Sequence, residues 1–265
     1  SGTIAGSIAA DRAPETEFEA ATVGLPCSAI RYAVAPERAH QPVETAMSKY
    51  RIPFNKPSFA GSEERYISEA IERGHISGDG HFTKACHALL QTTLGVQKVL
   101  LTTNCTHALE MTAFLLDCQP GDEVIFPSFA FVTTVNAYVV RGVKPVFADV
   151  RPDTLNLDET KIERLITKRT KAIMALHYAG VACEMDALLA LGKKHGLPVV
   201  EDNAHGLYGK YKGRYLGTLG VMATQSFHET KNFTCGEGGG GQSEQGDGNE
   251  GKHAHRSRPH FAVER

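Results

Sequence analysis

The feature that most constrains the fold of this chain is a repeated alternation of short apolar runs and amphipathic segments between residues 98 and 228. Short apolar runs bounded by turn residues are typical of strands buried on both faces, as in parallel sheets. Predicted strands cover residues 98–103, 122–127, 144–150, 171–177, 197–202 and 221–228. Predicted helices cover residues 105–117, 131–142, 157–167 and 184–196. The alternation therefore predicts an α/β fold with a mostly parallel sheet between helices.

Local signals support the ends of several predicted helices. Gly142 and Gly196 stand at the ends of two of them, and glycine commonly ends helices. Asp158 stands at the start of a third, where its carboxylate can accept a hydrogen bond from the first turn.

Composition narrows the class of protein without identifying an activity. The chain has 265 residues, of which 42% are hydrophobic and 22% charged, as in an ordinary globular protein with an ample core. Its formal net charge of -2 gives no reason to expect nucleic acid or an anionic membrane as a partner. No apolar run is as long as a membrane span, and no signal peptide is recognised at the start. The 6 cysteines form no CxxC pair, which favours reduced thiols and a cytoplasmic location.

Three regions of the chain differ in composition and in hydrophobic periodicity. Residues 1–50 show no sustained period and are predicted to be a poorly ordered N-terminal extension, with a native N-terminal arm as the alternative. Residues 51–241 are predicted to form the large domain, and residues 242–265 a disordered polar tail. The "HAH" at 253–255 lacks further ligands, so no metal site is predicted. The formal GxGxxG at 236–241 opens no predicted helix, so we reject a dinucleotide fingerprint there.

Candidate site residues follow the carboxyl ends of the predicted strands, because ligands of open parallel sheets bind beyond those ends. Cys105 and Thr106 begin the helix after the first strand, where unpaired backbone N–H groups and the helix dipole favour a phosphate group. Phe131 lies just beyond the second strand and offers an aromatic face.

The later strands end at polar and charged residues. Asp202 ends the fifth predicted strand, and His205 follows it closely. Ser226 lies near the end of the sixth, and Lys231 follows five residues later. Each residue alone has a plainer interpretation, such as a surface charge, a cap or a core side chain. Together a phosphate cradle, an aromatic ring, a carboxylate and a lysine suit pyridoxal 5'-phosphate, whose aldehyde binds an amine and whose ring nitrogen pairs with an acid.

The same motifs carry a resemblance to a known family. The segments "KVLLTTNCTHALEM", "PGDEVIFPSFAFVTTVNAYVVRGVKPVF", "VVEDNAHG" and "SFHETKNFTCGEGG" resemble the DegT/DnrJ/EryC1/StrS sugar aminotransferases, in family order, over about residues 52–240. The resemblance implies the fold type I of pyridoxal-phosphate enzymes: a large domain with a seven-stranded sheet, a small C-terminal domain, and active sites shared across a homodimer. Since the family continues well beyond the GEGG segment, we expect the small domain to be largely missing here.

The resemblance also implies a role for each candidate residue. Lys231 matches the lysine that binds the cofactor covalently, and Asp202 matches the carboxylate paired with the pyridine nitrogen. His205 stands where the family has Gln or His near the phenolic oxygen of the cofactor. The remaining matches are Phe131, which covers the ring, and Cys105, Thr106 and Ser226, which bind the phosphate. Cys105 departs from the usual residue, so only its backbone N–H is needed there.

The activity implied by the resemblance is a two-stage transamination. L-Glutamate donates the amino group, and a nucleotide-linked 4-keto-6-deoxy sugar accepts it. Within the family the motifs are most similar to the enterobacterial branch that uses dTDP-4-keto-6-deoxyglucose. Lysine at 231, in place of the histidine of the dehydratase branch, favours transamination. Two alternatives stay open: a protein that binds the cofactor without turnover, and a structural fragment that needs an intact partner subunit.

Overall fold

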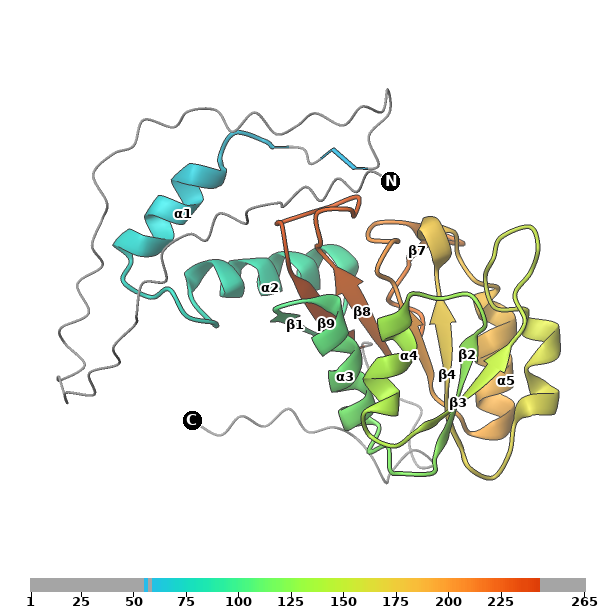
Figure 1. The fold of residues 1–265 in the computed structure, drawn as a ribbon. Coiled ribbons are helices and arrows are strands. Elements are labelled where there is room, and N and C mark those ends of the chain that lie inside the picture. Colours follow the sequence, from blue (N-terminus) through green and yellow to red (C-terminus); the bar gives the residue numbers. More distant parts are fainter. Residues whose placement is uncertain (1–54, 57–58, 244–265) are drawn as a thin grey trace, which may run out of the picture. The chain divides into compact units, whose positions relative to one another are not determined.

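The computed structural model describes residues 55–56 and 59–243 (Figure 1). The chain divides into two units, Ser1–Arg51 and Ile52–Arg265, and all of the described residues belong to the second. The predicted extension at 1–50 and the tail beyond residue 243 lie outside the described residues, as does the "HAH" segment.

The secondary structure alternates between strands and helices from residue 98 onward. It comprises α1 (Glu63–Glu72), α2 (His81–Leu94), β1 (Lys98–Thr102), α3 (Cys105–Leu115), β2 (Glu123–Pro127), α4 (Val132–Val139) and β3 (Lys144–Ala148). It continues with the 3-10 helices η2 (Glu159–Lys161) and η3 (Glu163–Leu165), then β4 (Thr170–Leu176), η4 (Tyr178–Gly180), α5 (Met185–His195) and β5 (Val199–Asp202). The last elements are β6 (Lys210–Tyr211), β7 (Arg214–Tyr215), β8 (Met222–Ser226) and β9 (Gly239–Ser243).

The main sheet has 7 strands in the order β1-β9-β8-β5-β4-β2-β3. Strands β8, β5, β4, β2 and β3 are parallel to one another, and β9 is antiparallel to both β8 and β1. It follows that β1 runs in the same direction as β8, so only β9 opposes the rest. The predicted mostly parallel sheet is confirmed, and the carboxyl ends of six strands share one edge.

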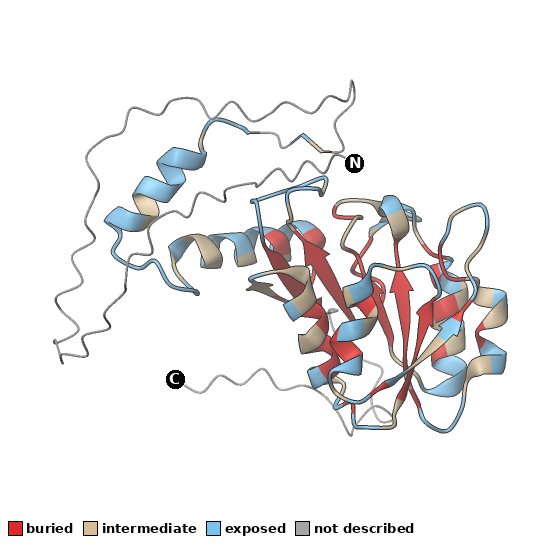
Figure 2. Ribbon diagram, viewed as in Figure 1, coloured by how far each residue is buried: buried red, intermediate tan, exposed pale blue. Residues whose placement is uncertain are grey.

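Alternate residues of the central strands enter two different cores. Val124 and Phe126 of β2 pack against α3 and α4, whereas Ile125 between them packs on the side of α5. The same alternation places Met174 with the first cluster and Ile173 with the second. Figures 1 and 2 show the buried strands between α3 and α4 on one face and α5 on the other. Burial on both faces explains why these strands are apolar throughout.

The first two helices were not predicted from the sequence. α2 packs against β1, and the backbone N–H of Leu101 donates to Nε2 of His87 at 2.8 Å. α2 also contributes Leu90 and Leu94 to a third apolar cluster that includes Leu207. Among the described residues, no helix combines the length and apolar character needed to cross a bilayer.

One predicted helix is wrong, and three strands were missed: β9 of the main sheet and the short strands β6 and β7. Residues 157–167 form the two short helices η2 and η3, because the Asp158 carboxylate accepts from both the N–H and the hydroxyl of Thr160 and holds a tight turn. β9 was not predicted because glycine is a poor strand former. It is a strand, so no helix begins at the GxGxxG segment 236–241. The sheet thus extends to Ser243, two residues past the predicted domain boundary.

Phe126 and Phe147 provide a matched test of this core, since they are register partners on β2 and β3. Phe126 is fully buried and packs edge-on against Tyr138, while Phe147 is 54% exposed. Phe126→Ala should lower the free energy of unfolding by about 3–5 kcal/mol. Phe147→Ala should cost less than about 1 kcal/mol. Denaturant titration of both variants measures the difference, and equal losses would contradict the described difference in burial between the two positions.

Candidate active site

Asp202 ends β5 at the shared carboxyl edge, and its side chain faces α4. It is 2% exposed, and its Oδ2 accepts a hydrogen bond from the Thr134 hydroxyl at 2.7 Å. Its Oδ1 accepts from the Ala204 N–H at 3.2 Å. Burial raises the pKa of this carboxyl above its ordinary value, although both hydrogen bonds oppose the change. An ionised Asp202 is therefore unfavourable unless a cation lies beside it.

His205 lies next to this carboxylate in the loop after β5. Its Nδ1 accepts a hydrogen bond from the backbone N–H of Ala179 at 3.1 Å, so the neutral ring carries its proton on Nε2. Burial lowers the pKa of His205 below its ordinary value, and the positive charge of Lys231 lowers it further. His205 is therefore a neutral hydrogen-bond donor at this edge.

Cys105 and Thr106 form the first turn of α3, directly beyond β1. The Asn104 side chain caps this helix by accepting from the His107 N–H at 2.9 Å. Within the described part of the chain, the N–H groups of Cys105 and Thr106 have no hydrogen-bond acceptor. Unpaired N–H groups at the start of an 11-residue helix can bind a phosphate group.

The Cys105 thiol lies near enough to Asp202 and Lys231 for both charges to affect its pKa. Burial raises its pKa, the Asp202 carboxylate raises it further, and Lys231 opposes the shift. The thiol is thus a neutral, poorly reactive group near both charges. The charges of Asp202 and Lys231 therefore act on both Cys105 and His205.

Lys231 lies in the loop between β8 and β9 and is partly buried. Its N–H donates to the carbonyl of His228 at 2.9 Å, which closes a turn. The next residue, Asn232, donates from its side chain to the Leu207 carbonyl at 3.1 Å. Phe233 packs edge-on against Tyr208, with ring centroids 4.9 Å apart. The lysine loop is therefore attached to the loop that follows β5.

The remaining predicted residues lie at the same edge. Ser226 ends β8 and is buried, with its hydroxyl 3.4 Å from the N–H of His228. Phe131 stands at the start of α4, and its ring is 67% exposed. Phe129 packs instead against Tyr178, which in turn contacts His205 edge-on. Phe131 is therefore the ring that stays free to cover a ligand.

Three residues of the site were missed from the sequence: Thr134, Tyr178 and Ala179. Tyr178 and Ala179 follow β4, so the rule used for the other strand ends could have found them. Thr134 lies inside α4, and nothing in its local sequence distinguishes it from Thr133. Only the packing of α4 over the end of β5 identifies it.

The donor set fits pyridoxal phosphate. It comprises a lysine amine, a buried carboxylate, a neutral imidazole donor, an exposed aromatic ring and unpaired helix N–H groups, as the chemistry of this cofactor requires. Among the described residues, no group of three His, Cys, Asp or Glu side chains could hold a metal ion.

Gly239 of β9 lies directly against the first turn of α3, the candidate phosphate site. A Cβ atom on Gly239 would overlap the backbone of Asn104 and Cys105, whereas one on Gly240 would have no neighbour closer than 3.4 Å. Gly239→Ala should therefore displace the turn and lower stability by about 1–3 kcal/mol, together with the affinity for pyridoxal phosphate. Gly240→Ala should be neutral or slightly stabilising. Thermal unfolding and cofactor titration of both variants test this, and similar behaviour of the pair would contradict it.

The raised pKa of Asp202 predicts a pH-dependent stability without cofactor. A folded chain that holds this proton more tightly than the unfolded chain loses stability as the pH rises from about 4, the unfolded pKa, through the folded value. Relative to Asp202→Asn, the native chain should therefore become less stable as the pH rises through this window. Urea titrations at several pH values measure the difference.

Asp158→Asn is the control, because hydrogen bonds from Thr160 lower the pKa of Asp158. Relative to that variant, the native chain should gain stability as the pH rises toward the unfolded pKa. If the stability difference from the native chain changed with pH in the same direction for both variants, burial would not determine the pKa of Asp202.

Comparison with known proteins gives consistent matches. A sequence model of the DegT/DnrJ/EryC1/StrS aminotransferase family matches residues 57–247. The spore coat polysaccharide biosynthesis protein SpsC of Bacillus subtilis (strain 168) is 37% identical over 188 residues, which are 71% of this chain and 48% of SpsC. The chain thus spans about half the length of this relative.

Solved structures of sugar aminotransferases also match this chain. Spr1654 from Streptococcus pneumoniae, described as a sugar aminotransferase, has a TM-score of 0.70 at 30% identity, covering 75% of this chain and 53% of Spr1654 in its PMP form. A second structure of Spr1654 is its PLP form. DesI, solved with its TDP-sugar product, has a TM-score of 0.66 at 32% identity, covering 71% of this chain and 47% of DesI.

Proposed function

Because this chain belongs to the DegT/DnrJ/EryC1/StrS aminotransferase family, we propose that it acts as a pyridoxal-phosphate-dependent transaminase on a nucleotide-linked keto sugar. One observation carries the proposal: a fully buried carboxylate, Asp202, shares the carboxyl edge of the sheet with Lys231. Both charges affect the pKa of His205, which Lys231 lowers and Asp202 raises. An acid and an amine in this setting match the two ends of the cofactor ring system.

Lys231 is the proposed covalent anchor of the cofactor. Pyridoxal phosphate, when bound, supplies an aldehyde that carries the amino group from the donor to the acceptor. Once its amine is displaced by the amino donor, Lys231 acts as general base and then as general acid at the reacting carbon. The attachment of its loop through Asn232 to Leu207 keeps the amine near the other site residues.

Asp202 holds a proton on the pyridine nitrogen in this proposal. Its burial makes an isolated anion costly, and a pyridinium ion removes that cost while the dry surroundings strengthen the pair. Thr134 fixes the carboxylate from the other side. His205, neutral with its proton on Nε2, donates toward the phenolic oxygen.

The other residues bind and orient the cofactor. The N–H groups of Cys105 and Thr106 and the hydroxyl of Ser226 hold the phosphate, and the side chain of Cys105 has no part in this. Phe131 covers one face of the ring. This arrangement leaves the opposite face for the amino donor and the sugar.

The proposed substrates are L-glutamate and a nucleotide-linked 4-keto-6-deoxy sugar, with dTDP-4-keto-6-deoxyglucose as the specific acceptor. The sequence motifs support the sugar class, and the TDP-sugar product bound to DesI is consistent with it. A homodimer with shared active sites and a cytoplasmic location belong to the same proposal. Glutamate leaves as 2-oxoglutarate, and the sugar keto group becomes an amine.

The extent of the matches favours a second candidate function. This chain covers 48% of SpsC and 53% of Spr1654, so half of each relative has no counterpart here. The described residues supply cofactor contacts, whereas turnover can require segments or subunits that the match does not include. The alternatives are therefore cofactor binding without turnover and a fragment that functions with an intact partner subunit.

The decisive experiment follows the cofactor bound to the purified chain. With pyridoxal phosphate added, we expect a visible absorption band that changes on addition of L-glutamate. Borohydride reduction and peptide mapping should place the pyridoxyl group on Lys231. Lys231→Ala should lose the band and the label, because no other amine replaces it. Lys193→Ala, an exposed lysine at the end of α5, should retain both.

Other outcomes separate the candidates. A label on a different lysine refutes the assignment of Lys231. A band that glutamate does not change favours binding without turnover. Cofactor binding that requires a full-length homologous subunit favours the fragment. Conversion of dTDP-4-keto-6-deoxyglucose to an amino sugar tests the specific acceptor.

A further inference from the structure

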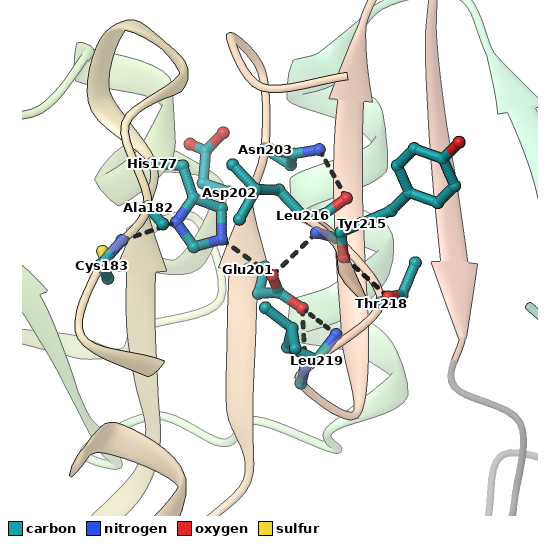
Figure 3. Close-up of polar contacts among 12 residues, drawn as sticks. His177, Ala182, Cys183, Glu201, Asp202, Asn203, Tyr215, Leu216, Thr218 and Leu219 are labelled. Atoms are coloured by element: carbon teal, nitrogen blue, oxygen red, sulfur yellow. Dashed lines mark hydrogen bonds and ion pairs between the residues drawn. The ribbon is translucent and has the colours of Figure 1, made fainter. Parts of the chain in front are cut away.

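Glu201 is a buried carboxylate that the proposed chemistry does not use. It precedes Asp202 on β5, and its side chain lies on the opposite face of the sheet (Figure 3). Oε1 accepts from the N–H groups of Leu219 and Gly220 at 2.7 and 2.6 Å. Oε2 accepts from the Gly217 N–H and from Nε2 of His177, both at 2.8 Å. Four hydrogen bonds therefore satisfy a carboxylate with no exposed surface.

The hydrogen bonds fix the charge of this cluster. Nδ1 of His177 accepts from the Cys183 N–H at 3.2 Å, so the ring proton lies on Nε2 and is donated to Glu201. Burial alone would raise the pKa of Glu201, but the donors around it hold its pKa below the ordinary value. Glu201 is thus a buried anion stabilised by four neutral donors.

These donors belong to two other segments of the chain, one that precedes β8 and one that follows β4. Gly217, Leu219 and Gly220 precede β8, which leads to Ser226 and the Lys231 loop. His177 follows β4, and its backbone N–H donates to the carbonyl of Asp202 at 3.1 Å. Glu201 therefore joins the strand that carries Asp202 to the strand that leads to the lysine.

Glycine makes the approach of the loop possible. Gly217 has a φ of +83°, and a Cβ on it would lie 2.6 Å from Nε2 of Gln242. A Cβ on Gly220 would overlap the carbonyl of Val199. Consecutive backbone N–H groups directed at one anion form a nest, here occupied by a side chain of the same protein.

We propose that Glu201 is a positioning residue that fixes Asp202 relative to β8 through the loop at 217–220 and the neutral imidazole of His177. The proposal rests on the proposed function, because Asp202 matters only if it meets a cofactor. The geometry itself does not depend on that function. Loss of the anion releases three N–H groups and the imidazole at once. The effect then reaches Asp202 through His177, whose backbone N–H donates to the Asp202 carbonyl.

The test compares Glu201→Gln with Ile162→Ala in the full chain. The amide keeps the size of the side chain but turns an NH₂ group toward the N–H of Gly217 or the ring of His177. Ile162 is fully buried and stands between η2 and η3 in the sequence, and its loss destabilises the core without removing a hydrogen-bond donor of Glu201. Thermal unfolding gives the stability of each variant, against which local effects are judged.

Two readouts report on Asp202 itself. The Ala204 N–H donates to its carboxylate, so amide hydrogen exchange at Ala204 follows the position of Asp202 without any cofactor. At matched global stability, we expect exchange at Ala204 to be about tenfold faster in Glu201→Gln than in Ile162→Ala. This factor corresponds to the loss of one buried hydrogen bond to a charged group. The affinity for pyridoxal phosphate should fall about tenfold by the same comparison.

A second variant keeps the proposal testable if Glu201→Gln does not fold. His177→Phe preserves a ring but removes one donor of the four, and Ala204 exchange should accelerate by a smaller factor in the same direction. Exchange at Ala204 that matches the Ile162→Ala control in whichever variant folds would overturn the positioning role. Failure of the native chain to bind the cofactor would refute the proposed function alone, because the exchange experiment judges the positioning role separately.

Discussion

Two successive carboxylates on β5, Glu201 and Asp202, are both buried, and the pleat of the strand sends them to opposite faces of the sheet. Each would be costly alone, since a buried charge loses its hydration. Four neutral donors stabilise the Glu201 carboxylate, and its pKa is held below the ordinary value. Asp202 has only two donors, and its pKa is raised. The unsatisfied member of the pair is the one that faces the candidate site, where a cation can stabilise it.

The difference between the two carboxylates follows from what covers each face. On the face of α5, the loop at 217–220 supplies backbone N–H groups because its glycines allow close approach. On the face of α3 and α4, Thr134 supplies one hydroxyl and the rest of the edge stays open to a ligand. The sheet thus separates Glu201, whose hydrogen bonds are satisfied within the protein, from Asp202, which faces the candidate site, although the two residues are adjacent in sequence.

β9 places a second restriction on the site. Among the described strands of the sheet, β9 alone runs against the others. It lies between β1 and β8, which lead to the first turn of α3 and to Lys231. Gly239 touches the backbone at Asn104 and Cys105, so the strand supports the turn from below without a side chain. Gln242 extends this role to the other face, donating to the carbonyl of Gly217 and accepting from Gln225. Gln242 thus holds the loop at 217–220, which also donates hydrogen bonds to Glu201.

The sequence by itself determined the strands and their shared edge, because burial on both faces forces each parallel strand to be apolar over its whole length. The strand order in the sequence therefore predicts that Asp202 and Lys231 share one edge, since carboxyl ends of parallel strands meet. The tertiary structure alone decided the partners of those residues: Thr134 from α4, the donors around Glu201, and the close approach of Gly239. These contacts join segments far apart in the chain, and no local period records them. β9 forms because pairing with β1 and β8 outweighs the weak strand preference of glycine. The predicted helix at 157–167 does not form because the Asp158 side chain holds a tight turn in its place.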